Sequence, residues 1–243
     1  MPTQRDVEIE IEPGTRTYAY LALPDAPQGA PGVVVLGEIW GVNGNIRKIC
    51  DRLAAQGIVA LAPDQYRGIT PPRDGDPQDH VMGYFERFDD PQGIRDGRAM
   101  IASLRDGRFG VAPRDVHVWG FCMGGRFAHY LAAFAPGLAG VINFYGRVVF
   151  PRDEARKPFM PLDVAGLVAC PYLGLFGAID PLIPAPDVAA LRAKLAAIGV
   201  RHHVSIYESA EHAFFNETRA SYHPDAAADA WRRVLAFVKT GAL

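Results

Sequence analysis

The chain lacks most of the features that mark exported and membrane proteins. It contains only three cysteines in 243 residues, an odd number that indicates no disulfide framework and favours a reducing compartment. No apolar stretch approaches the roughly 20 residues that a membrane-spanning helix needs. The N-terminal segment also lacks the apolar centre of a signal peptide. We therefore predict a cytoplasmic protein with no membrane partner.

Charge and the absence of several ligand motifs exclude further classes. The formal net charge of −2 and the isoelectric point of about 6.4 give no reason to expect nucleic acid or an anionic membrane as a partner. The chain has no H-E-x-x-H motif, no paired C-x-x-C motifs and no cysteine–histidine cluster, so we expect no metal site. Phosphate-binding loops of the types G-x-x-x-x-G-K-[ST] and G-x-G-x-x-G are absent, so we expect no nucleotide cofactor.

Segments of strand and helix character alternate along the chain. Two strand-like segments near the N-terminus, 7–12 and 15–23, flank a Pro-Gly turn and predict an antiparallel edge hairpin. The alternation that follows is typical of an α/β fold with a mostly parallel, twisted sheet that helices cover on both faces. We predict a single domain over residues 1–243. Further strands are expected at 33–37, 58–62, 115–119, 140–145, 172–177 and 202–207, and helices at 44–56, 78–88, 93–106, 126–134, 185–198 and 225–239.

The motif G-x-C-x-G-G at residues 120–125 carries the most specific chemical information. It follows a short β-prone run and precedes a segment of helical spacing, which is the context of a nucleophile elbow. In such an elbow the central side chain stands exposed on a strained turn, and glycines two residues before and after it allow strand and helix to approach closely. We therefore interpret Cys122 as a catalytic nucleophile. The alternative is a buried structural thiol, since free cysteines are often buried.

A nucleophile of this kind needs a histidine as its base. His212 lies just past the strand-like segment 202–207, in the loop region where open α/β sheets bind their ligands. We therefore predict His212 as the general base. The other histidines after Cys122 are His129 on the predicted elbow helix, His202 and His203 at a predicted strand start, and His223 at a predicted helix start.

The base in turn needs a carboxylate that orients it. Asp180 follows the apolar strand-like segment 172–177 and precedes a proline, which is compatible with a rigid turn. Asp163 precedes that strand and Asp187 starts a predicted helix, so both are weaker candidates. In the predicted set, Asp180 holds the tautomer of His212, and His212 takes the thiol proton of Cys122 and later returns it to the leaving group.

Several segments together make the chain resemble the dienelactone hydrolase family, the carboxymethylenebutenolidases. The resemblance covers almost the whole chain and implies the α/β-hydrolase fold, a cytosolic enzyme, and a Cys-His-Asp triad that opens an enol-lactone. It assigns these three roles to Cys122, His212 and Asp180. The segments that carry the resemblance are 38–43, 62–64, 76–79, 120–125, 144–146, 177–180 and 211–214.

The resemblance also implies roles for residues around the nucleophile. Glu38 is expected to contact the thiol of Cys122 and to keep it poorly reactive until substrate binds, although a solvated carboxylate at a strand end is the simpler interpretation of the residue alone. A carboxylate near a thiol opposes its ionisation, whereas a protonated histidine favours it. The backbone N–H groups of Met123 and Ile39 are the expected oxyanion donors.

Substrate contacts are less well defined by the sequence. Trp40, Tyr84, Tyr145 and Phe214 are candidates to line the substrate pocket, although core packing is the simpler interpretation of each residue taken alone. The family holds a substrate carboxylate with arginines, and one of those positions is Asn216 in this chain. The departure widens the expected substrates to other lactones, activated esters and thioesters. Arg87, Arg95 and Arg147 are possible replacements for the missing arginines, and the expected lid segments are 66–79 and 147–167.

Three functions are compatible with these residues. The first is a cysteine hydrolase that opens a lactone or cleaves a small carboxylic ester through a thioester acyl-enzyme. The second is an acyltransferase or thioesterase that uses the same triad. The third is a non-catalytic ligand receptor or redox sensor with the same fold, because a fold does not by itself determine a function. The sequence does not choose between a monomer and a homo-oligomer.

Overall fold

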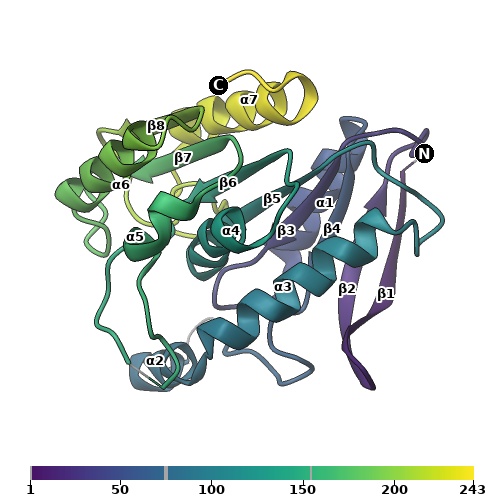
Figure 1. The fold of residues 1–243 in the computed structure, drawn as a ribbon, viewed down its shortest axis with the longest axis horizontal. Coiled ribbons are helices and arrows are strands. Elements are labelled where there is room, and N and C mark those ends of the chain that lie inside the picture. Colours follow the sequence, from purple (N-terminus) through teal and green to yellow (C-terminus); the bar gives the residue numbers. More distant parts are fainter. Residues whose placement is uncertain (1, 74–75, 154) are drawn as a thin grey trace. The chain divides into compact units, whose positions relative to one another are not determined.

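The computed structural model describes residues 2–73, 76–153 and 155–243 (Figure 1). The chain contains two compact units. The N-terminal unit comprises Met1–Val116 together with Asp153–Pro158, and the C-terminal unit comprises His117–Arg152 together with Phe159–Leu243. That the whole chain forms one domain stays a prediction.

The N-terminal unit contains the predicted edge hairpin. Strands β1 (Thr3–Glu12) and β2 (Thr15–Leu23) pair antiparallel, and Gly14 in the turn between them has a φ of 80°, which glycine adopts without steric cost. Strand β2 pairs antiparallel with β4 (Val59–Pro63), and β4 pairs in parallel with β3 (Gly32–Leu36), giving the order β1-β2-β4-β3. Both β3 and β4 are buried along their whole length, as expected for strands covered on two faces.

Three helices belong to this unit, namely α1 (Gly44–Ala55), α2 (Gln78–Arg87) and α3 (Asp90–Arg105). Helix α1 packs against β2 and β4, and α3 packs against β1 and β3. Helix α3 begins three residues earlier than predicted. The reason is local: Asp89 is the N-cap, its carboxylate accepting a hydrogen bond from the backbone N–H of Gln92 at 2.7 Å, and Pro91 fits the first turn.

The C-terminal unit is built on four parallel strands in the order β5-β6-β7-β8. They are β5 (Val116–Phe121), β6 (Gly140–Phe144), β7 (Tyr172–Gly177) and β8 (His202–Tyr207), and the first three are buried throughout. The helices of this unit are α4 (Met123–Phe134), α5 (Pro161–Val164), α6 (Ala185–Ala197) and α7 (Pro224–Thr240), with a 3-10 turn at Ala165–Leu167. The strand and helix alternation predicted from the sequence is therefore confirmed.

Two predicted segments are described only in part. Residues 74–75 of the expected lid segment 66–79 and residue 154 of the expected lid segment 147–167 lie outside the described residues. The second segment contains α5 and the 3-10 turn, neither of which the sequence pattern predicted, and α5 packs against α4. That either segment acts as a lid stays a prediction. No helix in the described part of the chain is long and apolar enough to cross a membrane.

Candidate active site

Cys122 occupies a strained turn between β5 and α4. Its φ of 52° and ψ of −111° lie in a region that residues with a side chain rarely adopt, at a cost of about 1–3 kcal/mol. The turn is held by two backbone hydrogen bonds: the N–H of Cys122 donates to the carbonyl of Phe144 at 3.0 Å, and its carbonyl accepts from the N–H of Arg126 at 3.1 Å. The thiol is free and half-buried. This is the backbone of the predicted nucleophile elbow.

Glycines are required where the elbow is most tightly packed. A Cβ atom at Gly120 would collide with the backbone of Gly124, and one at Gly125 would lie 2.5 Å from Oδ1 of Asn143. A Cβ atom at Gly146 would collide with the backbone of Gly125. The sequence predicted a close approach at Gly120, which is confirmed. The structure adds Gly146, a glycine outside the motif on the loop after the neighbouring strand.

His212 and Asp180 form a direct pair. Nδ1 of His212 lies 2.7 Å from Oδ2 of Asp180, and the aspartate side chain is fully buried while that of the histidine is 19% exposed. The second carboxylate oxygen, Oδ1, accepts a hydrogen bond from the backbone N–H of Leu182 at 2.8 Å, which fixes the carboxylate in its loop. Asp180 follows β7 and His212 follows β8, as predicted, so both lie past the carboxyl ends of parallel strands.

The electrostatics of His212 depend on its two neighbours. Burial lowers the pKa of His212, but the Cys122 thiolate and the Asp180 carboxylate outweigh burial and raise this pKa to about 10. Since Nδ1 is bonded to Asp180, the remaining ring nitrogen is Nε2. That atom is buried and has no hydrogen-bond partner of ordinary geometry within the described residues. His212 therefore binds a proton tightly whenever Cys122 is a thiolate, which is the state that proton transfer from the thiol produces.

The other histidines considered from the sequence are held elsewhere. His203 lies 2.7 Å from the hydroxyl of Ser205, and His202 lies 2.8 Å from the carbonyl of Val200. The ring of His223 accepts a hydrogen bond from the backbone N–H of Ala226 and is the N-cap of α7. None of these contacts involves Cys122 or Asp180, so His212 is the histidine that the structure brings together with the predicted nucleophile and acid.

The two alternative carboxylates also have local partners. Asp163 accepts a hydrogen bond from the backbone N–H of Met160 at 2.9 Å and lies 3.8 Å from Arg152. Asp187 lies in the first turn of α6, where a negative charge suits the helix dipole. Asp180 is thus the one of the three predicted carboxylates for which the structure records a bond to His212.

A network of buried hydrogen bonds connects Gly146, which packs against the elbow, with His129 of α4. The sequence did not predict this network. The backbone N–H of Gly146 donates to Oδ1 of Asn143 at 2.9 Å, and Nδ2 of Asn143 donates to the hydroxyl of Tyr172 at 2.8 Å. That hydroxyl lies 3.0 Å from Nδ1 of His129, whose Nε2 lies 2.8 Å from the carbonyl of Pro161. The signal in the sequence was a lone polar residue, Asn143, within an apolar strand.

The direction of this network follows from the protonation of His129. Burial lowers the pKa of His129 to about 4, so the ring is neutral at neutral pH. A carbonyl can only accept, so the ring proton lies on Nε2, and Nδ1 accepts from the hydroxyl of Tyr172. The four hydrogen bonds therefore all run in the same direction. The backbone N–H of Gly146 donates to Asn143, and Asn143 donates to Tyr172. Tyr172 in turn donates to His129, and His129 donates to the carbonyl of Pro161. This hydrogen-bond network holds Gly146 against helix α4. It also gives His129 a structural role, which agrees with its predicted position away from the catalytic residues.

Tyr145 and Phe214 pack next to the triad. Tyr145 has a φ of 40° and its ring meets the imidazole of His212 edge-on, with centroids 5.2 Å apart. Phe214 is fully buried, with ring centroids 5.4 Å from Tyr145 and 5.2 Å from Tyr207. Phe214 is therefore a core residue that supports Tyr145. A direct contact of either residue with substrate stays a prediction.

Asn216 forms part of its own turn. Its side chain Oδ1 accepts hydrogen bonds from the backbone N–H of Thr218 at 3.0 Å and from the hydroxyl of Thr218 at 2.7 Å. The residue is only 1% exposed. These contacts favour a structural role for Asn216, and its predicted contact with substrate remains untested.

Most of the remaining predicted site residues lie in the N-terminal unit, and one, Met123, lies in the C-terminal unit. Glu38 follows β3, is 3% exposed, and its carbonyl accepts from the N–H of Gly41 at 3.1 Å in a tight turn. The carbonyl of Ile39 in this turn accepts a hydrogen bond from the hydroxyl of Tyr66 at 2.5 Å. In the C-terminal unit, Met123 is the first residue of α4, where N–H groups lack intrahelical partners. The predicted roles of Glu38, Ile39, Met123, Trp40 and Tyr84 stay predictions.

The three candidate arginines differ in their surroundings. The guanidinium of Arg95 donates to Oε1 of Gln92 at 2.6 Å. Arg147 follows Gly146 and Tyr145, and its Nε atom is buried with no hydrogen-bond partner among the described residues. Arg87 donates from Nε to the carbonyl of Gly83 at 2.9 Å. Of the three, Arg147 is nearest in the chain to a residue that touches the triad.

Comparisons with known proteins identify the family of the chain. The model of the dienelactone hydrolase family matches residues 17–241. A Salmonella typhimurium protein provisionally named a carboxymethylenebutenolidase is 37% identical over 224 residues, which make up 89% of this chain and 80% of that relative. A crystal structure from Klebsiella pneumoniae, provisionally named a dienelactone hydrolase, has a TM-score of 0.89 at 32% identity and covers 98% of this chain and 99% of that one.

The fold is shared more widely than the family. The acylaminoacyl peptidase of Pyrococcus horikoshii has a TM-score of 0.76 at 15% identity and covers 97% of this chain and 41% of the peptidase, a likeness that concerns the fold alone. The chain therefore has the α/β-hydrolase fold that was predicted from its sequence. Since the family model matches nearly the whole chain and a relative is more than 30% identical across most of both proteins, the chain belongs to the dienelactone hydrolase family.

Proposed function

We propose that the chain is a cysteine hydrolase that opens a lactone, or cleaves a small carboxylic ester, through a thioester on Cys122. Membership of the dienelactone hydrolase family makes it a hydrolase of carboxylic esters or lactones. The observation that supports a cysteine mechanism is the buried Asp180–His212 pair together with the free cysteine Cys122, whose thiolate form raises the pKa of the imidazole.

In the first half of the reaction, His212 accepts the thiol proton and the sulfur of Cys122 attacks the carbonyl carbon of the substrate. The carbonyl oxygen becomes an oxyanion, for which we propose the N–H groups of Met123 and Ile39 as donors. Collapse of this intermediate breaks the bond between carbon and the ring or ester oxygen. That oxygen takes the proton from His212 and leaves a thioester on the enzyme.

In the second half, a water molecule attacks the thioester carbon while His212 takes one of its protons. The carbon–sulfur bond breaks, the thiolate recovers the proton from His212, and the carboxylic acid is released. Asp180 holds the ring with Nε2 available throughout, because its own bond occupies Nδ1. One hydrolysis thus consumes one water and regenerates the neutral thiol and imidazole.

The deciding experiment follows dienelactone by its ultraviolet absorbance with wild-type protein and with Cys122→Ala. Rapid loss with the wild type only supports both the nucleophile and a carboxylate-bearing lactone. Equal loss with both proteins would refute the cysteine mechanism. Loss with neither directs the search to neutral lactones and esters, on which the same pair of proteins is then compared.

The proposed role of Glu38 has a separate test. If this carboxylate holds the thiol of Cys122 in a poorly reactive state, Glu38→Gln is alkylated by iodoacetamide faster than the wild type, because one negative charge that opposes thiolate formation is removed. Equal alkylation rates in the absence of substrate would refute the role. Cys50 and Cys170 are both buried, and a Cys122→Ala background measures any contribution from them.

A further inference from the structure

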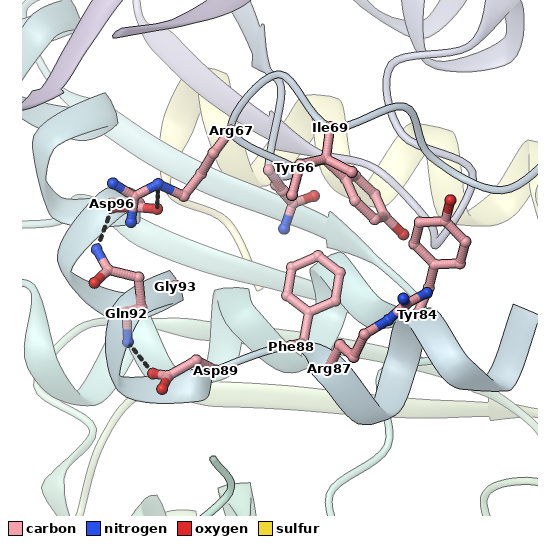
Figure 2. A pocket seen from close by; sticks show the side chains of 11 residues that line it. Tyr66, Arg67, Ile69, Tyr84, Arg87, Phe88, Asp89, Gln92, Gly93 and Asp96 are labelled. Atoms are coloured by element: carbon pink, nitrogen blue, oxygen red, sulfur yellow. Dashed lines mark hydrogen bonds and ion pairs between the residues drawn. The ribbon is translucent and has the colours of Figure 1, made fainter. Parts of the chain in front are cut away.

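The cavity that Figure 2 shows in the N-terminal unit has a volume of about 290 Å³, and Arg87 is among its lining residues. Its aromatic side chains pack on one another: the ring of Tyr66 meets that of Phe88 edge-on with centroids 4.9 Å apart, and it meets that of Tyr84 edge-on at 5.8 Å. Tyr84 is one of the residues predicted to contact substrate, so this cavity is not evidence of a second site. The apolar side chains beside the proposed triad in the C-terminal unit differ, because they are exposed.

The loop between β7 and α6, residues 178–184, is called the acid loop here because it contains Asp180. Ile179 is 55% exposed and Leu182 is 44% exposed, whereas Asp180 between them is 5% exposed. The other exposed apolar residues of this loop are Ala178, Pro181 and Pro184. A single exposed apolar side chain is ordinary. Here two large ones lie on either side of the carboxylate that bonds His212.

The backbone of the acid loop is held at both of these apolar residues. The N–H of Ile179 donates to the carbonyl of Ala210, on the loop after β8, at 3.2 Å. The N–H of Leu182 donates to Oδ1 of Asp180 at 2.8 Å. The two prolines of the loop restrict its φ angles further. The side chains of Ile179 and Leu182 are therefore held exposed next to Asp180 and do not fold back into the core.

The neighbouring loop carries negative charge. This loop, residues 208–216, follows β8 and is called the base loop because it contains His212; Glu208 and Glu211 on it are exposed. Neither the acid loop nor the base loop contains a lysine or an arginine. The two exposed carboxylates repel an anion in solution, whereas they do not repel an uncharged apolar group. The surroundings of the proposed acid and base in these two loops therefore favour a neutral, apolar ligand.

We propose that Ile179 and Leu182 bind the apolar part of a neutral ester or lactone whose carbonyl carbon is attacked by Cys122. This inference rests on the proposed function and narrows its substrate class. All of these residues belong to the C-terminal unit, and the two apolar side chains flank the residue that bonds His212. An alkyl chain of a substrate bound beside His212 covers them and removes apolar surface from water on both partners.

The test compares two neutral lactones, δ-valerolactone and δ-decalactone, in their binding to the Cys122→Ala protein, measured by ligand-observed NMR titration. Both have the same six-membered ring, and only δ-decalactone carries an alkyl chain. We expect δ-decalactone to bind about tenfold more tightly or better, since each fully buried methylene strengthens binding about fourfold. Ile179→Ser and Leu182→Ser, each in the Cys122→Ala background, are expected to weaken δ-decalactone binding about threefold or more and to leave δ-valerolactone binding unchanged.

Leu167→Ser is the matched control. Leu167 is 57% exposed and belongs to the same unit, but it precedes β7, whereas the acid loop follows the other end of that strand. This variant is expected to bind both lactones as the parent protein does. A δ-lactone with a chain of the same length that ends in a carboxylate is expected to bind no more tightly than δ-valerolactone, because the exposed carboxylates of the base loop repel it.

Four results would overturn the proposal. They are no binding of δ-decalactone at millimolar concentration, equal affinities for the two neutral lactones, an unchanged δ-decalactone affinity in both serine variants, and equally tight binding of the lactone with the carboxylate. If the serine variants kept their affinity and sedimented more slowly than the parent, the exposed side chains would instead form a contact between two copies of the chain.

Hydrolysis of δ-decalactone by the wild type is followed separately. Because binding is measured without turnover, the two ideas fail in different ways. Chain-dependent binding without hydrolysis would count against the proposed function and not against the binding surface. Hydrolysis with an affinity that does not depend on the chain would refute the binding surface alone.

Discussion

The surroundings of His212 and of Arg67 show how two polar clusters in one chain differ in purpose. Each contains a cation between buried or half-buried acids, and each perturbs the pKa of its members. Around Arg67, the guanidinium and Gln92 hold the pKa of Glu12 below its usual range, and burial raises the pKa of Asp96. Around His212, the thiolate of Cys122 and the carboxylate of Asp180 raise the pKa of the imidazole despite its burial.

The difference lies in the atoms that remain available. Arg67 has a carboxylate on each side, and Gln92 uses its amide to bridge Glu12 and Asp96 at 2.7 and 2.8 Å. That cluster is closed, and it ties strand β1 to helix α3. His212 has one nitrogen bonded to Asp180 and a second, buried nitrogen with no partner of ordinary geometry in the described part of the chain. A perturbed pKa therefore indicates a reactive site only where an atom is left free to act.

The largest effect that would test this comparison is the loss of His212. We expect His212→Ala to lower kcat for lactone hydrolysis by at least about a thousandfold, because removal of a triad member typically costs that much or more. His202→Ala is the matched control, since that histidine lies at the start of β8, where its Nδ1 lies 2.8 Å from the carbonyl oxygen of Val200. Steady-state kinetics compare kcat of the two variants. If the two kcat values are similar, His212 is not the general base.

The next largest effect is on stability at the elbow. Gly120→Ala is expected to lower the free energy of unfolding by about 3 kcal/mol or more, because the added Cβ collides with the backbone of Gly124, which cannot move without breaking the turn. Gly166→Ala is the control, since a Cβ there meets nothing within 4 Å. Urea unfolding compares the two. If Gly120→Ala were as stable as Gly166→Ala, glycine at position 120 would not be required for the close approach of β5 and α4.

A smaller effect concerns the charge of the substrate. If Arg147 binds a substrate carboxylate, Arg147→Gln raises KM for dienelactone roughly tenfold while kcat changes little, because a contact made equally in ground and transition states is lost. A neutral lactone of similar size is the control substrate and should show no change in KM. An equal change for both lactones would assign Arg147 to the structure of the loop and not to substrate recognition.

The smallest effect is on the pH dependence of stability. Although burial opposes it, the carboxylate of Asp180 is one of the groups that raise the pKa of His212 in the folded protein, so its contribution to stability is fully present below pH 6.5 and is lost as the pH rises through the raised pKa. Asp180→Asn removes part of this contribution. We expect the wild type to be more stable than Asp180→Asn by about 1–2 kcal/mol near pH 6. The difference should shrink as the pH approaches 10, and a constant difference in urea unfolding would contradict the raised pKa.

Much of the site was predictable because its residues are tied to regular positions in the chain. A nucleophile elbow needs glycine at a set distance from the nucleophile, and residues that follow parallel strands meet at one edge of a sheet. The strained turn at Cys122 and the pairing of Asp180 with His212 could therefore be predicted from spacing and strand order. The chain of bonds through Asn143, Tyr172 and His129 could not, because its members come from three different elements and have no common spacing.

The sequence by itself determined the alternation of strands and helices and the turn at Cys122, and it predicted an acid and a base for that residue, since these depend on local pattern and on chain order. The tertiary structure alone decided that Asn216 bonds within its own turn, that Gly146 must be a glycine, and that Arg87 lies beside a cavity lined by Tyr66, Tyr84 and Phe88. The requirement for glycine at position 146 arises from a contact with Gly125, far away in the chain, whereas the bond between Asn216 and Thr218 is local and depends on how the loop folds. Side-chain identity sets which contacts are chemically possible, and only packing selects which of them form.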